Sequence, residues 1–468
     1  MYLTSHPGYF YEMEDMSINP LLIRKYNRPV PRYTSYPTVP FWKENIDETE
    51  WISGFQQRFN EENHRNGISL YIHLPFCESL CTYCGCNKKI TTNHSVEEEY
   101  LDVLEKEWLL YRNKMKQVPV IRELHLGGGT PTFFSPPNLE RLTNFILNRS
   151  IIHPRHEFSV EGHPNNTTAD HLNVLWNAGF RRISYGVQDM NPLVQRAINR
   201  IQPLDNVKYV TEQARVTGFK SVNFDLIYGL PFQTEESIKT TIAQVISLRP
   251  DRIAFYSYAH VPWMSKAQRR FDETNLPSAE EKLNLYLQGK TLLIKAGYVD
   301  IGMDHFALPH DDLNIARKAG KLHRNFMGYT TLQTDILLGL GVSAISDTGH
   351  AYAQNEKTLH DYYAAINSGN LAITKGYFLD TIDMDFKKYI LDISCKGQTH
   401  FRQKDKPLLE QYVFPALAEL KKDGLIERMD DGLTLTGQGH YFIRNICSAF
   451  DLYLHKIESE KKLFSKSI

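Results

Sequence analysis

Short apolar runs alternate with segments of helical periodicity along the chain from about residue 70. The apolar and β-branched runs predict strands, and the segments in which apolar residues recur every three or four positions predict helices. The predicted strands cover residues 70–76, 121–126, 157–161, 182–187, 221–228 and 252–258, and the predicted helices cover residues 96–110, 138–147, 169–177, 206–216, 235–248 and 279–293. This alternation is typical of an α/β fold with a parallel sheet, because parallel neighbours need a crossover connection.

Polar or glycine-rich segments lie at the carboxyl ends of all six predicted strands. They begin at Cys77, Gly127, Glu161, Gln188, Asp225 and Tyr258. The carboxyl ends of parallel strands gather at one edge of a sheet, and binding groups collect there. We therefore predict a partial (β/α)6 TIM-like barrel with parallel strands and a single site at that edge.

Four regions are expected along the chain. Residues 1–60 form an N-terminal arm and helical segment, residues 61–300 the barrel core, residues 301–375 an extension that closes the barrel, and residues 376–468 a mainly helical C-terminal domain. The four prolines within residues 27–40 favour an extended arm. Residues 424–437 predict a hairpin that turns at Asp431 and Gly432 after a helix, so we expect a winged-helix-like unit there.

The charge balance and the apolar runs exclude several classes of partner. The chain has 53 Lys and Arg against 54 Asp and Glu, so no overall field attracts nucleic acid or an anionic membrane. Residues 1–16 lack the basic flank and the apolar run of a signal peptide, and no apolar run is long enough to span a membrane. We expect a cytoplasmic monomer with neither nucleic acid nor a membrane as partner.

Four of the six cysteines lie within ten residues, a spacing typical of a metal site rather than of a disulfide framework. Cys77, Cys81 and Cys84 have the spacing CxxxCxxC directly after a predicted strand. Three thiolates on a [4Fe–4S] cluster leave one iron open, whereas four favour electron transfer or a closed zinc site. Cys86 is too near Cys84 for easy joint ligation of one cluster, so we expect it to have a second role beside the cluster.

Two further features at the predicted edge have alternative interpretations. The run of glycines at residues 127–129 lets a ligand lie against the backbone, but it also suits a tight strand-to-helix turn. Glu161 can accept hydrogen bonds from ribose hydroxyls or an ammonium group, although a glutamate after a strand is commonly only solvated. Other residues are expected to have structural roles, namely Cys395, Cys447, His163, His260, His305 and His323.

Together these motifs resemble the radical S-adenosylmethionine superfamily, through CxxxCxxC after the first strand, GGGTP after the second and a glutamate after the third. From about residue 21 to the C-terminus, the chain is similar to the oxygen-independent coproporphyrinogen III oxidase family. The resemblance rests on PRYTSYPT (31–38), YIHLPFC (71–77), CGCNK (84–88), GGGTPT (127–132), GVQD (186–189), FDLIYGLP (224–231), YAH (258–260), GMDHFA (302–307), HRNF (323–326), GVSAIS (341–346) and IRNIC (443–447).

The resemblance implies a set of cofactor-binding residues. Cys77, Cys81 and Cys84 would hold a [4Fe–4S] cluster, S-adenosylmethionine would bind its open iron, and Cys86 would not be a ligand. Two S-adenosylmethionine molecules are implied, the first at Tyr71, Gly128, Glu161 and Ile345, and the second at Tyr83, Gly129, Thr130, Gln188, Arg200, Asp225 and Ala259. The sequence departs from the family at Gly162-His163-Pro164, where a hydrophobic-acidic-proline triplet is more usual, so the contacts beside Glu161 are left open.

The implied reaction belongs to heme biosynthesis. A 5′-deoxyadenosyl radical removes hydrogen from two propionates of coproporphyrinogen III, which become vinyl groups of protoporphyrinogen IX as carbon dioxide leaves. An electron donor for the cluster and an electron acceptor, both of unknown identity, are required. Because the substrate carries four propionates, we hypothesise that Arg32 and Arg324 bind them. The alternative is that Arg32 only anchors the arm.

Three other functions are weighed against this one. A related heme chaperone, which binds heme without decarboxylating it, typically lacks both Cys86 and the RYTSYPT segment. A DNA reader with a redox-sensing cluster would need a basic stripe on its C-terminal helices, yet Glu410, Glu419 and Asp423 lie among the lysines there. An electron-carrying ferredoxin-type module would not need a scaffold as large as a barrel.

Overall fold

The computed structural model describes residues 19–263, 265–456 and 464. The expectations for residues 1–16 therefore lie outside the described residues. The six predicted strands are present as β2 (Ile68–Leu74), β5 (Val120–Gly128), β6 (Ile151–Gly162), β7 (Phe180–Gln188), β8 (Ser221–Tyr228) and β9 (Arg252–Ser257). Each pairs in parallel with the next. The predicted parallel core of the α/β fold is confirmed.

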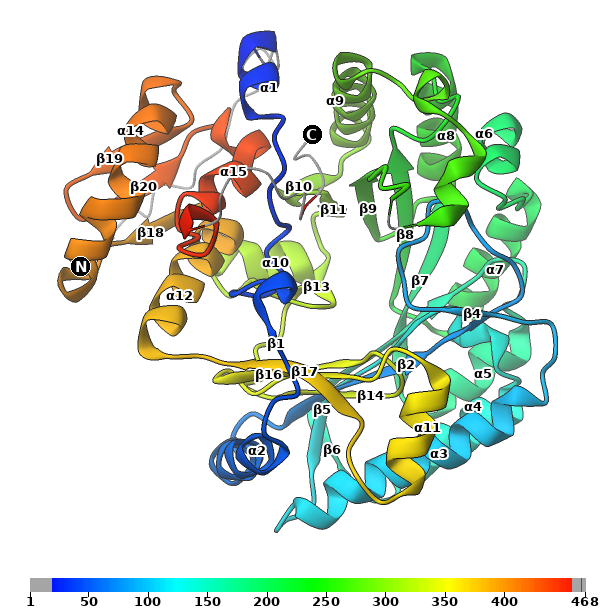
Figure 1. Cartoon of the computed structure of the whole chain (residues 1–468). Coiled ribbons are helices and arrows are strands. Elements are labelled where there is room, and N and C mark those ends of the chain that lie inside the picture. Colours follow the sequence, from blue (N-terminus) through cyan, green and yellow to red (C-terminus); the bar gives the residue numbers. More distant parts are fainter. Residues whose placement is uncertain (1–18, 264, 457–463, 465–468) are drawn as a thin grey trace, which may run out of the picture.

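The sheet extends beyond these six strands and curves into an open crescent (Figure 1). It has 13 strands in the order β1-β17-β16-β15-β14-β2-β5-β6-β7-β8-β9-β11-β10. Beside β2 lies β14 (Leu337–Leu340), also parallel. The remaining strands are antiparallel additions at the two ends: β1 (Lys43–Glu44), β17 (Ile373–Phe378), β16 (Ala351–Asn355), β15 (Ile345–Asp347), β11 (His305–Ala307) and β10 (Val299–Gly302).

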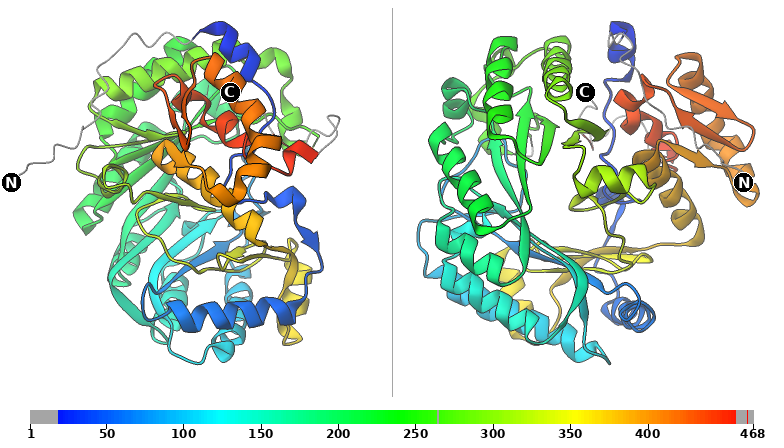
Figure 2. Two further views of the ribbon diagram at one scale, coloured as in Figure 1. Left: turned by 90° about the vertical axis from the view of Figure 1, so that its left-hand side faces the viewer. Right: turned by 180° about the vertical axis from the view of Figure 1, so that it is seen from behind.

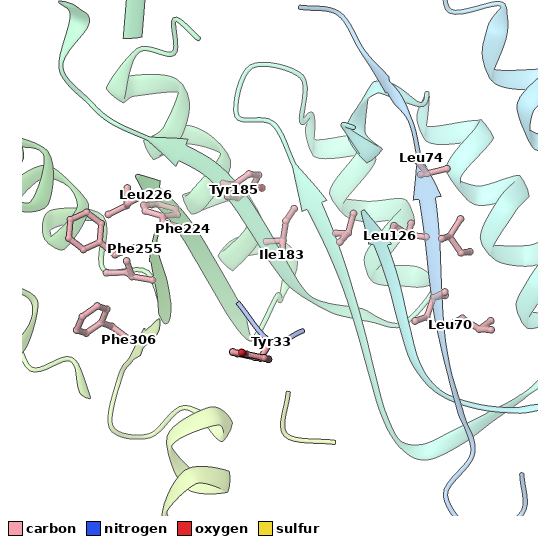
Figure 3. Packing of buried hydrophobic residues seen from close by; sticks show 14 of the residues in the cluster. Tyr33, Leu70, Leu74, Leu126, Ile183, Tyr185, Phe224, Leu226, Phe255 and Phe306 are labelled. Carbon is pink, nitrogen blue, oxygen red and sulfur yellow. The ribbon is translucent and has the colours of Figure 1, made fainter. Parts of the chain in front are cut away.

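Helices cover the convex face of the parallel strands (Figures 1 and 2). They are α3 (Val96–Lys114), α4 (Pro136–Leu147), α5 (Ala169–Asn177), α6 (Pro192–Ala197), α7 (Leu204–Thr217), α8 (Glu235–Leu248) and α9 (Ala279–Lys295). Alternate strand residues such as Leu70, Leu126 and Tyr185 are fully buried in this layer (Figure 3). Because side chains alternate between the two faces of a strand, every second residue points outward to the helices, and these residues are apolar.

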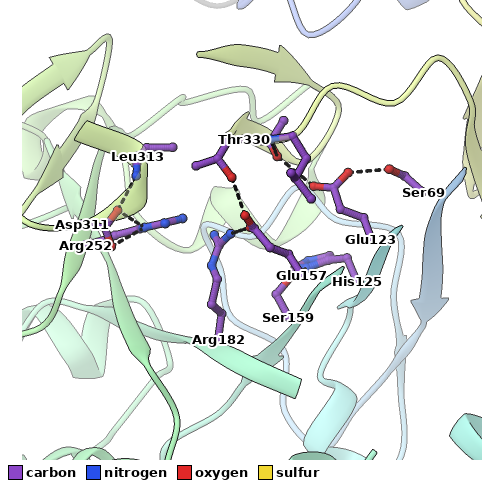
Figure 4. A network of polar contacts seen from close by, with 12 residues as sticks. Ser69, Glu123, His125, Glu157, Ser159, Arg182, Arg252, Asp311, Leu313 and Thr330 are labelled. Atoms are coloured by element: carbon purple, nitrogen blue, oxygen red, sulfur yellow. Dashed lines mark hydrogen bonds and ion pairs between the residues drawn. The ribbon is translucent and has the colours of Figure 1, made fainter. Parts of the chain in front are cut away.

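The same alternation directs polar side chains to the concave face. Near the amino ends of the strands, Glu123 accepts hydrogen bonds from Ser69 and from Thr330, and Arg182 donates to Glu157 at 2.7 Å (Figure 4). Thr330 ends the hairpin of β12 (His323–Asn325) and β13 (Gly328–Thr330). This network forms a polar floor below the edge where the site was predicted.

The N-terminal arm runs between the barrel and the C-terminal unit (Figure 1). It follows α1 (Pro20–Tyr26) and has no helix before a short turn at Val39–Phe41, as predicted. Tyr33 donates to Asp451 at 3.0 Å, and Arg444 donates to the carbonyl of Pro31 at 3.2 Å. The arm is followed by α2 (Glu48–Glu62). Two further helices lie later in the chain, α10 (Asp312–Lys318) and α11 (Leu359–Asn367).

The C-terminal unit has the expected helix and hairpin order. It contains α12 (Thr381–Lys396), β18 (Gln398–His400), α13 (Lys406–Leu408), α14 (Phe414–Lys422), β19 (Ile426–Met429), β20 (Gly432–Leu435) and α15 (Ile443–Ser448). The predicted turn at Asp431 and Gly432 is wrong by one residue, because Met429 pairs with Gly432. Gly432 also pairs with His400 of β18, and a Cβ there would lie 2.4 Å from the carbonyl of Thr399, so this packing draws the glycine into the strand.

Two of the strand boundaries that differ from the prediction have a clear physical cause. The first run stops at Leu74 because Pro75 has no N–H to continue the ladder, and Phe76–Cys77 pairs instead as β3 with β4 (Lys89–Ile90). The third strand begins at Ile151, six residues early, since it follows β5 from Val120 onward. Within the described part of the chain, no helix combines the length and apolar character that crossing a bilayer would require.

Candidate active site

The cysteine loop leaves the tip of β2 and returns beside it. Cys77 lies in β3, and the amide of Cys84 donates to the carbonyl of Cys81 at 3.3 Å. Cys81 is buried at 7% exposure, Cys77 and Cys84 are half-buried, and Cys86 is exposed. In the described chain, no three Cys, His, Asp or Glu side chains converge closely enough to hold a single metal ion.

Donors surround the three thiols of the CxxxCxxC motif. Arg200 Nη1 lies 3.6 Å from Cys81 Sγ, and the Thr130 hydroxyl lies 3.3 Å from Cys77 Sγ. A hydrogen bond from Cys86 and the charge of Lys88 lower the pKa of Cys84 to about 6, although burial acts in the opposite direction. Burial raises the pKa of Cys77 to about 11. Thiolates are the form that binds iron. This donor set fits three cluster ligands.

The glycine run packs against the cysteine loop. Gly128 has a φ of +118°, which disfavours other residues, and the amide of Gly129 donates to the carbonyl of Leu74 at 2.9 Å. A Cβ on Gly129 would lie 2.6 Å from the backbone of Pro75. The tight-turn interpretation thus accounts for Gly129. A Cβ on Gly128 would lie 2.8 Å from the His73 ring, so this glycine lets His73 pack against the backbone.

Gly129→Ala is expected to destabilise the protein by about 1–3 kcal/mol, because backbone must move to accept the methyl group. Denaturant unfolding of the purified variant measures this directly. Gly85→Ala, in the neighbouring cysteine loop, is the matched control, since a Cβ at Gly85 meets nothing within 4 Å. Equal unfolding free energies for the two variants would contradict the proposed packing.

Glu161 is held at the tip of β6 by two donors. Its Oε2 accepts from the amide of Gly128 at 3.2 Å, and its Oε1 accepts from His125 Nε2 at 3.3 Å, while His125 Nδ1 bonds the Ser159 hydroxyl at 2.7 Å. Burial raises the pKa of Glu161, but the bonds from His125 and Gly128 outweigh it, and the net pKa lies below its ordinary value. The carboxylate is ionised and 43% exposed, so it can accept further hydrogen bonds.

A chain of hydrogen bonds ties Tyr71 to the cysteine loop. The Tyr71 hydroxyl lies 3.0 Å from His73 Nδ1, and His73 Nε2 lies 2.9 Å from the carbonyl of Asn87. A carbonyl only accepts, so His73 donates through Nε2 and accepts from Tyr71. His73 and His125 are two residues of the site that the sequence motifs did not predict. Alternation along β2 and β5 could have indicated them, because they share the inward face with Tyr71 and Gly127.

A second group of predicted residues lies at the tips of β7 and β8. Arg200 donates to the carbonyl of Gly186 from Nη2 at 2.6 Å, which places its guanidinium between β7 and Cys81. Asp225 accepts from Ser184 at 3.0 Å and from Asn223 at 2.9 Å, and burial raises its pKa to about 6. These contacts bring Arg200 and Asp225 to the same edge as the cysteines.

The other predicted residues extend this edge in both directions. Tyr83 packs against the cluster of side chains that contains Tyr258, and the carbonyl of Ala259 accepts from Gln268 at 3.2 Å. At the opposite end, Gly339 of β14 pairs with Tyr71, and a Cβ on Gly339 would lie 2.4 Å from the carbonyl of Ile345. Ile345 therefore lies two strands from Tyr71 along the same edge of the sheet.

The departure at Gly162-His163-Pro164 forms a tight turn. The amide of His163 donates to Thr132 at 3.1 Å, and its carbonyl accepts from the amide of Thr167 at 3.0 Å. Burial, and then Arg200, lower the pKa of His163 to about 3. Burial also lowers the pKa values of His260, His305 and His323. All four histidines are neutral near pH 7, which suits the structural roles expected for them.

Two arginines face the interior of the crescent without a carboxylate partner among the described residues. Arg32 Nη2 donates to the carbonyl of Ser257 at 2.9 Å, and Arg324, 8% exposed, lies over the ring of Tyr329 at 4.8 Å. Burial, and then the charges of Arg324, Arg252 and Arg32, lower the pKa of His305 to about 3. A cavity of about 160 Å³ adjoins Arg324 between the arm and α12.

Cys395 and Cys447 lie outside this edge, in the C-terminal unit. Both thiols are buried, and burial raises the pKa of Cys395 to about 11. Cys447 Sγ donates to the carbonyl of Ile390 at 3.7 Å. The expectation that these two cysteines belong to the core is confirmed.

Comparisons with known proteins agree with this geometry. Residues 71–245 match the model of the radical SAM superfamily. The chain is 39% identical over 453 residues to the oxygen-independent coproporphyrinogen III oxidase of Escherichia coli K12, which spans 96% of this chain and 98% of the relative, and 38% identical over 462 residues to that of Synechocystis. The solved structure of coproporphyrinogen III oxidase from E. coli, described as a radical SAM enzyme, superposes with a TM-score of 0.86 at 38% identity and covers 93% of this chain and 99% of that one.

Proposed function

The chain belongs to the oxygen-independent coproporphyrinogen III oxidase family of radical S-adenosylmethionine enzymes, and from this we propose the reaction that it catalyses. Coproporphyrinogen III loses two propionate carboxyl groups as carbon dioxide and becomes protoporphyrinogen IX. Two S-adenosylmethionine molecules are consumed, giving two methionines and two 5′-deoxyadenosines. The observation that carries the proposal is the position of three unbonded cysteines, a glycine run and an ionised glutamate at one edge of the sheet.

We assign the cluster to Cys77, Cys81 and Cys84. The first S-adenosylmethionine is assigned to Tyr71, Gly128, Glu161 and Ile345, and the second to Tyr83, Gly129, Thr130, Gln188, Arg200, Asp225 and Ala259. When bound, the cluster supplies the electron that cleaves S-adenosylmethionine to a radical able to take hydrogen from an unactivated carbon. Arg200 and Thr130 stabilise thiolates, and Glu161 supplies acceptors for hydroxyl or ammonium groups.

The residues around the site suit a reaction without acid–base catalysis. A propionate C–H bond gives a side-chain base nothing to act on, and the site histidines are half-buried and neutral: His163, His260, His305 and His323. The floor network and the arm enclose the concave face. The protein's contribution is to bind, orient and exclude water.

Arg32 and Arg324 are proposed to bind propionates of the substrate. Both guanidiniums lack a carboxylate partner in the described chain, and an arginine fork matches a carboxylate. The cavity beside Arg324, about 160 Å³, is similar in size to one of about 150 Å³ that holds benzene. It can therefore admit a propionate side chain, which has fewer heavy atoms than benzene. The bond from Arg32 to Ser257 also supports a role in anchoring the arm.

Arg32→Ala is expected to raise the KM for coproporphyrinogen III by about 10- to 100-fold, because a charge-assisted bond contributes about 1.5–3 kcal/mol. Cluster content and the affinity for S-adenosylmethionine should stay unchanged. Steady-state kinetics under anaerobic conditions measure both effects. Arg28→Ala is the control, since Arg28 is exposed near the start of the arm. If Arg32→Ala kept the wild-type KM and turnover, a role in substrate binding would be excluded.

The proposed function is tested by anaerobic reconstitution and assay of 5′-deoxyadenosine with and without coproporphyrinogen III. Formation of a vinyl product together with 5′-deoxyadenosine supports the oxidase. Stable binding of hemin without a vinyl product would support the heme chaperone instead. We further propose a cytoplasmic monomer, divided at about residues 60, 300 and 375, that depends on an external electron donor and acceptor.

A further inference from the structure

A fully buried glutamate on α3 binds three other parts of the chain. Glu107 Oε2 accepts from the amide of Gly341 and from the Tyr362 hydroxyl, each at 2.7 Å, and Oε1 accepts from Asn355 Nδ2 at 2.6 Å. Asn355 also donates to the carbonyl of Gly341 at 2.9 Å. One carboxylate thus joins α3 to α11, to the end of β16 and to the turn after β14.

That turn leads directly into the candidate active site. Residues 341–344 connect β14 to β15, which begins at Ile345. Tyr100 lies on the same face of α3 as Glu107. Its hydroxyl accepts a hydrogen bond from the amide of Val342 at 3.1 Å and donates one to the carbonyl of His73 at 2.6 Å. A Cβ on Gly341 would lie 2.5 Å from the Tyr100 hydroxyl. The helix therefore fixes the turn and the tip of β2 against each other.

We propose that Glu107 is a positioning residue for the first S-adenosylmethionine site, because its three hydrogen bonds set the place of the β14–β15 turn and hence of Ile345 relative to Tyr71. The inference rests on the assignment of Ile345 and Tyr71 to that site under the proposed function. Glu107 lies behind the turn on the helical layer, so it acts through the turn and not through contact with the cofactor.

The ionised carboxylate accepts all three bonds with its full negative charge. Protonation removes that charge and adds an O–H donor that competes with the three donors, so the bonds to the turn become weaker. The titratable groups around it are Tyr100, Tyr111 and Tyr362, whose pKa values burial raises, so they are neutral and offer no positive charge. Burial raises the pKa of Glu107 to about 7, although its hydrogen bonds with Tyr362, Gly341 and Asn355 lower the pKa in part.

The two consequences of this pKa have opposite signs. Because the pKa of Glu107 is higher in the folded protein than its usual value of about 4.3, its contribution to folding stability is complete below that value and is lost as the pH rises through about 7. The hydrogen bonds to the turn instead strengthen as the pH rises through about 7. Affinity for S-adenosylmethionine should therefore rise over the pH range in which this contribution to stability falls.

The test compares wild type with Glu107→Gln. The dissociation constant for S-adenosylmethionine is measured on reconstituted protein, and amide hydrogen exchange of residues 341–345 is measured without cofactor. In wild type the ionised fraction grows from about 0.1 at a pH of about 6 to about 0.9 at a pH of about 8, so affinity should rise about ninefold. Glu107→Gln should bind weakly at both pH values and exchange these amides faster. Glu105→Gln, on the same helix but paired with Arg141 of α4, is the matched control and should behave as wild type.

Tyr362→Phe gives a second arm if Glu107→Gln folds poorly. Loss of that hydroxyl removes a bond that lowers the pKa of Glu107, so the midpoint of S-adenosylmethionine binding should move to higher pH. Normal binding with the wild-type pH profile and exchange rates in both variants would overturn the role of Glu107 alone. Failure of wild type to bind S-adenosylmethionine would overturn the proposed function, and this role with it.

Discussion

Replacing Cys81 with serine is expected to abolish formation of 5′-deoxyadenosine, a loss of more than about 10³-fold, equivalent to more than about 4 kcal/mol. Cys81 is the most buried thiol of the CxxxCxxC motif and lies against Arg200. With one of three ligands lost, the cluster has too few thiolates to stay bound. Iron and sulfide analysis after anaerobic reconstitution, followed by the 5′-deoxyadenosine assay, measures both parts of this effect.

Two other cysteines serve as controls for that experiment. Cys395→Ala removes a buried thiol of the C-terminal unit and should leave iron content unchanged. Cys86→Ser should also keep the iron, because Cys86 is assigned no bond to the cluster. Wild-type iron content in Cys81→Ser, or loss of iron in Cys86→Ser, would show that the ligand set has been assigned wrongly.

Glu161→Gln is expected to weaken S-adenosylmethionine binding by about 10- to 100-fold, because hydrogen bonds to a charged group contribute about 1.5–3 kcal/mol. The amide also loses one acceptor and places an N–H group toward the donors Gly128 and His125. Equilibrium binding of labelled S-adenosylmethionine to the reconstituted variant checks this, with cluster content measured in parallel. Glu140→Gln, an exposed position on α4, is the control. Tight binding by Glu161→Gln would remove this residue from the site.

The parallel core was predicted well because its strands and helices are marked by apolar patterns within each segment. The run at residues 221–228 coincides with β8, and helices α5 and α8 begin and end where their periodicity does. The six polar tips also lie at one edge, as the order of the strands requires. The N-terminal half of β6 was missed, because Pro154 and the basic residues beside it hide a strand that only pairing with β5 reveals.

The residues that position the site were harder to find. His73 and His125 share strand faces with predicted residues, so strand alternation contained a usable signal for both. The sequence contained no local signal for Glu107, since its hydrogen-bond partners lie more than two hundred positions away at Gly341, Asn355 and Tyr362. The hairpin turn differs from its predicted position for the same physical reason, because pairing with β18 determines the register of Gly432. Contacts between distant segments override local preference at such points.

The open iron of the cluster is the central claim, and ⁵⁷Fe Mössbauer spectroscopy of the reconstituted protein tests it most directly. Spectra are taken before and after addition of S-adenosylmethionine. We expect one iron of the four to change its parameters on addition, while the three irons bound by Cys77, Cys81 and Cys84 do not. Four irons with thiolate-type parameters that S-adenosylmethionine leaves unchanged would contradict the central claim.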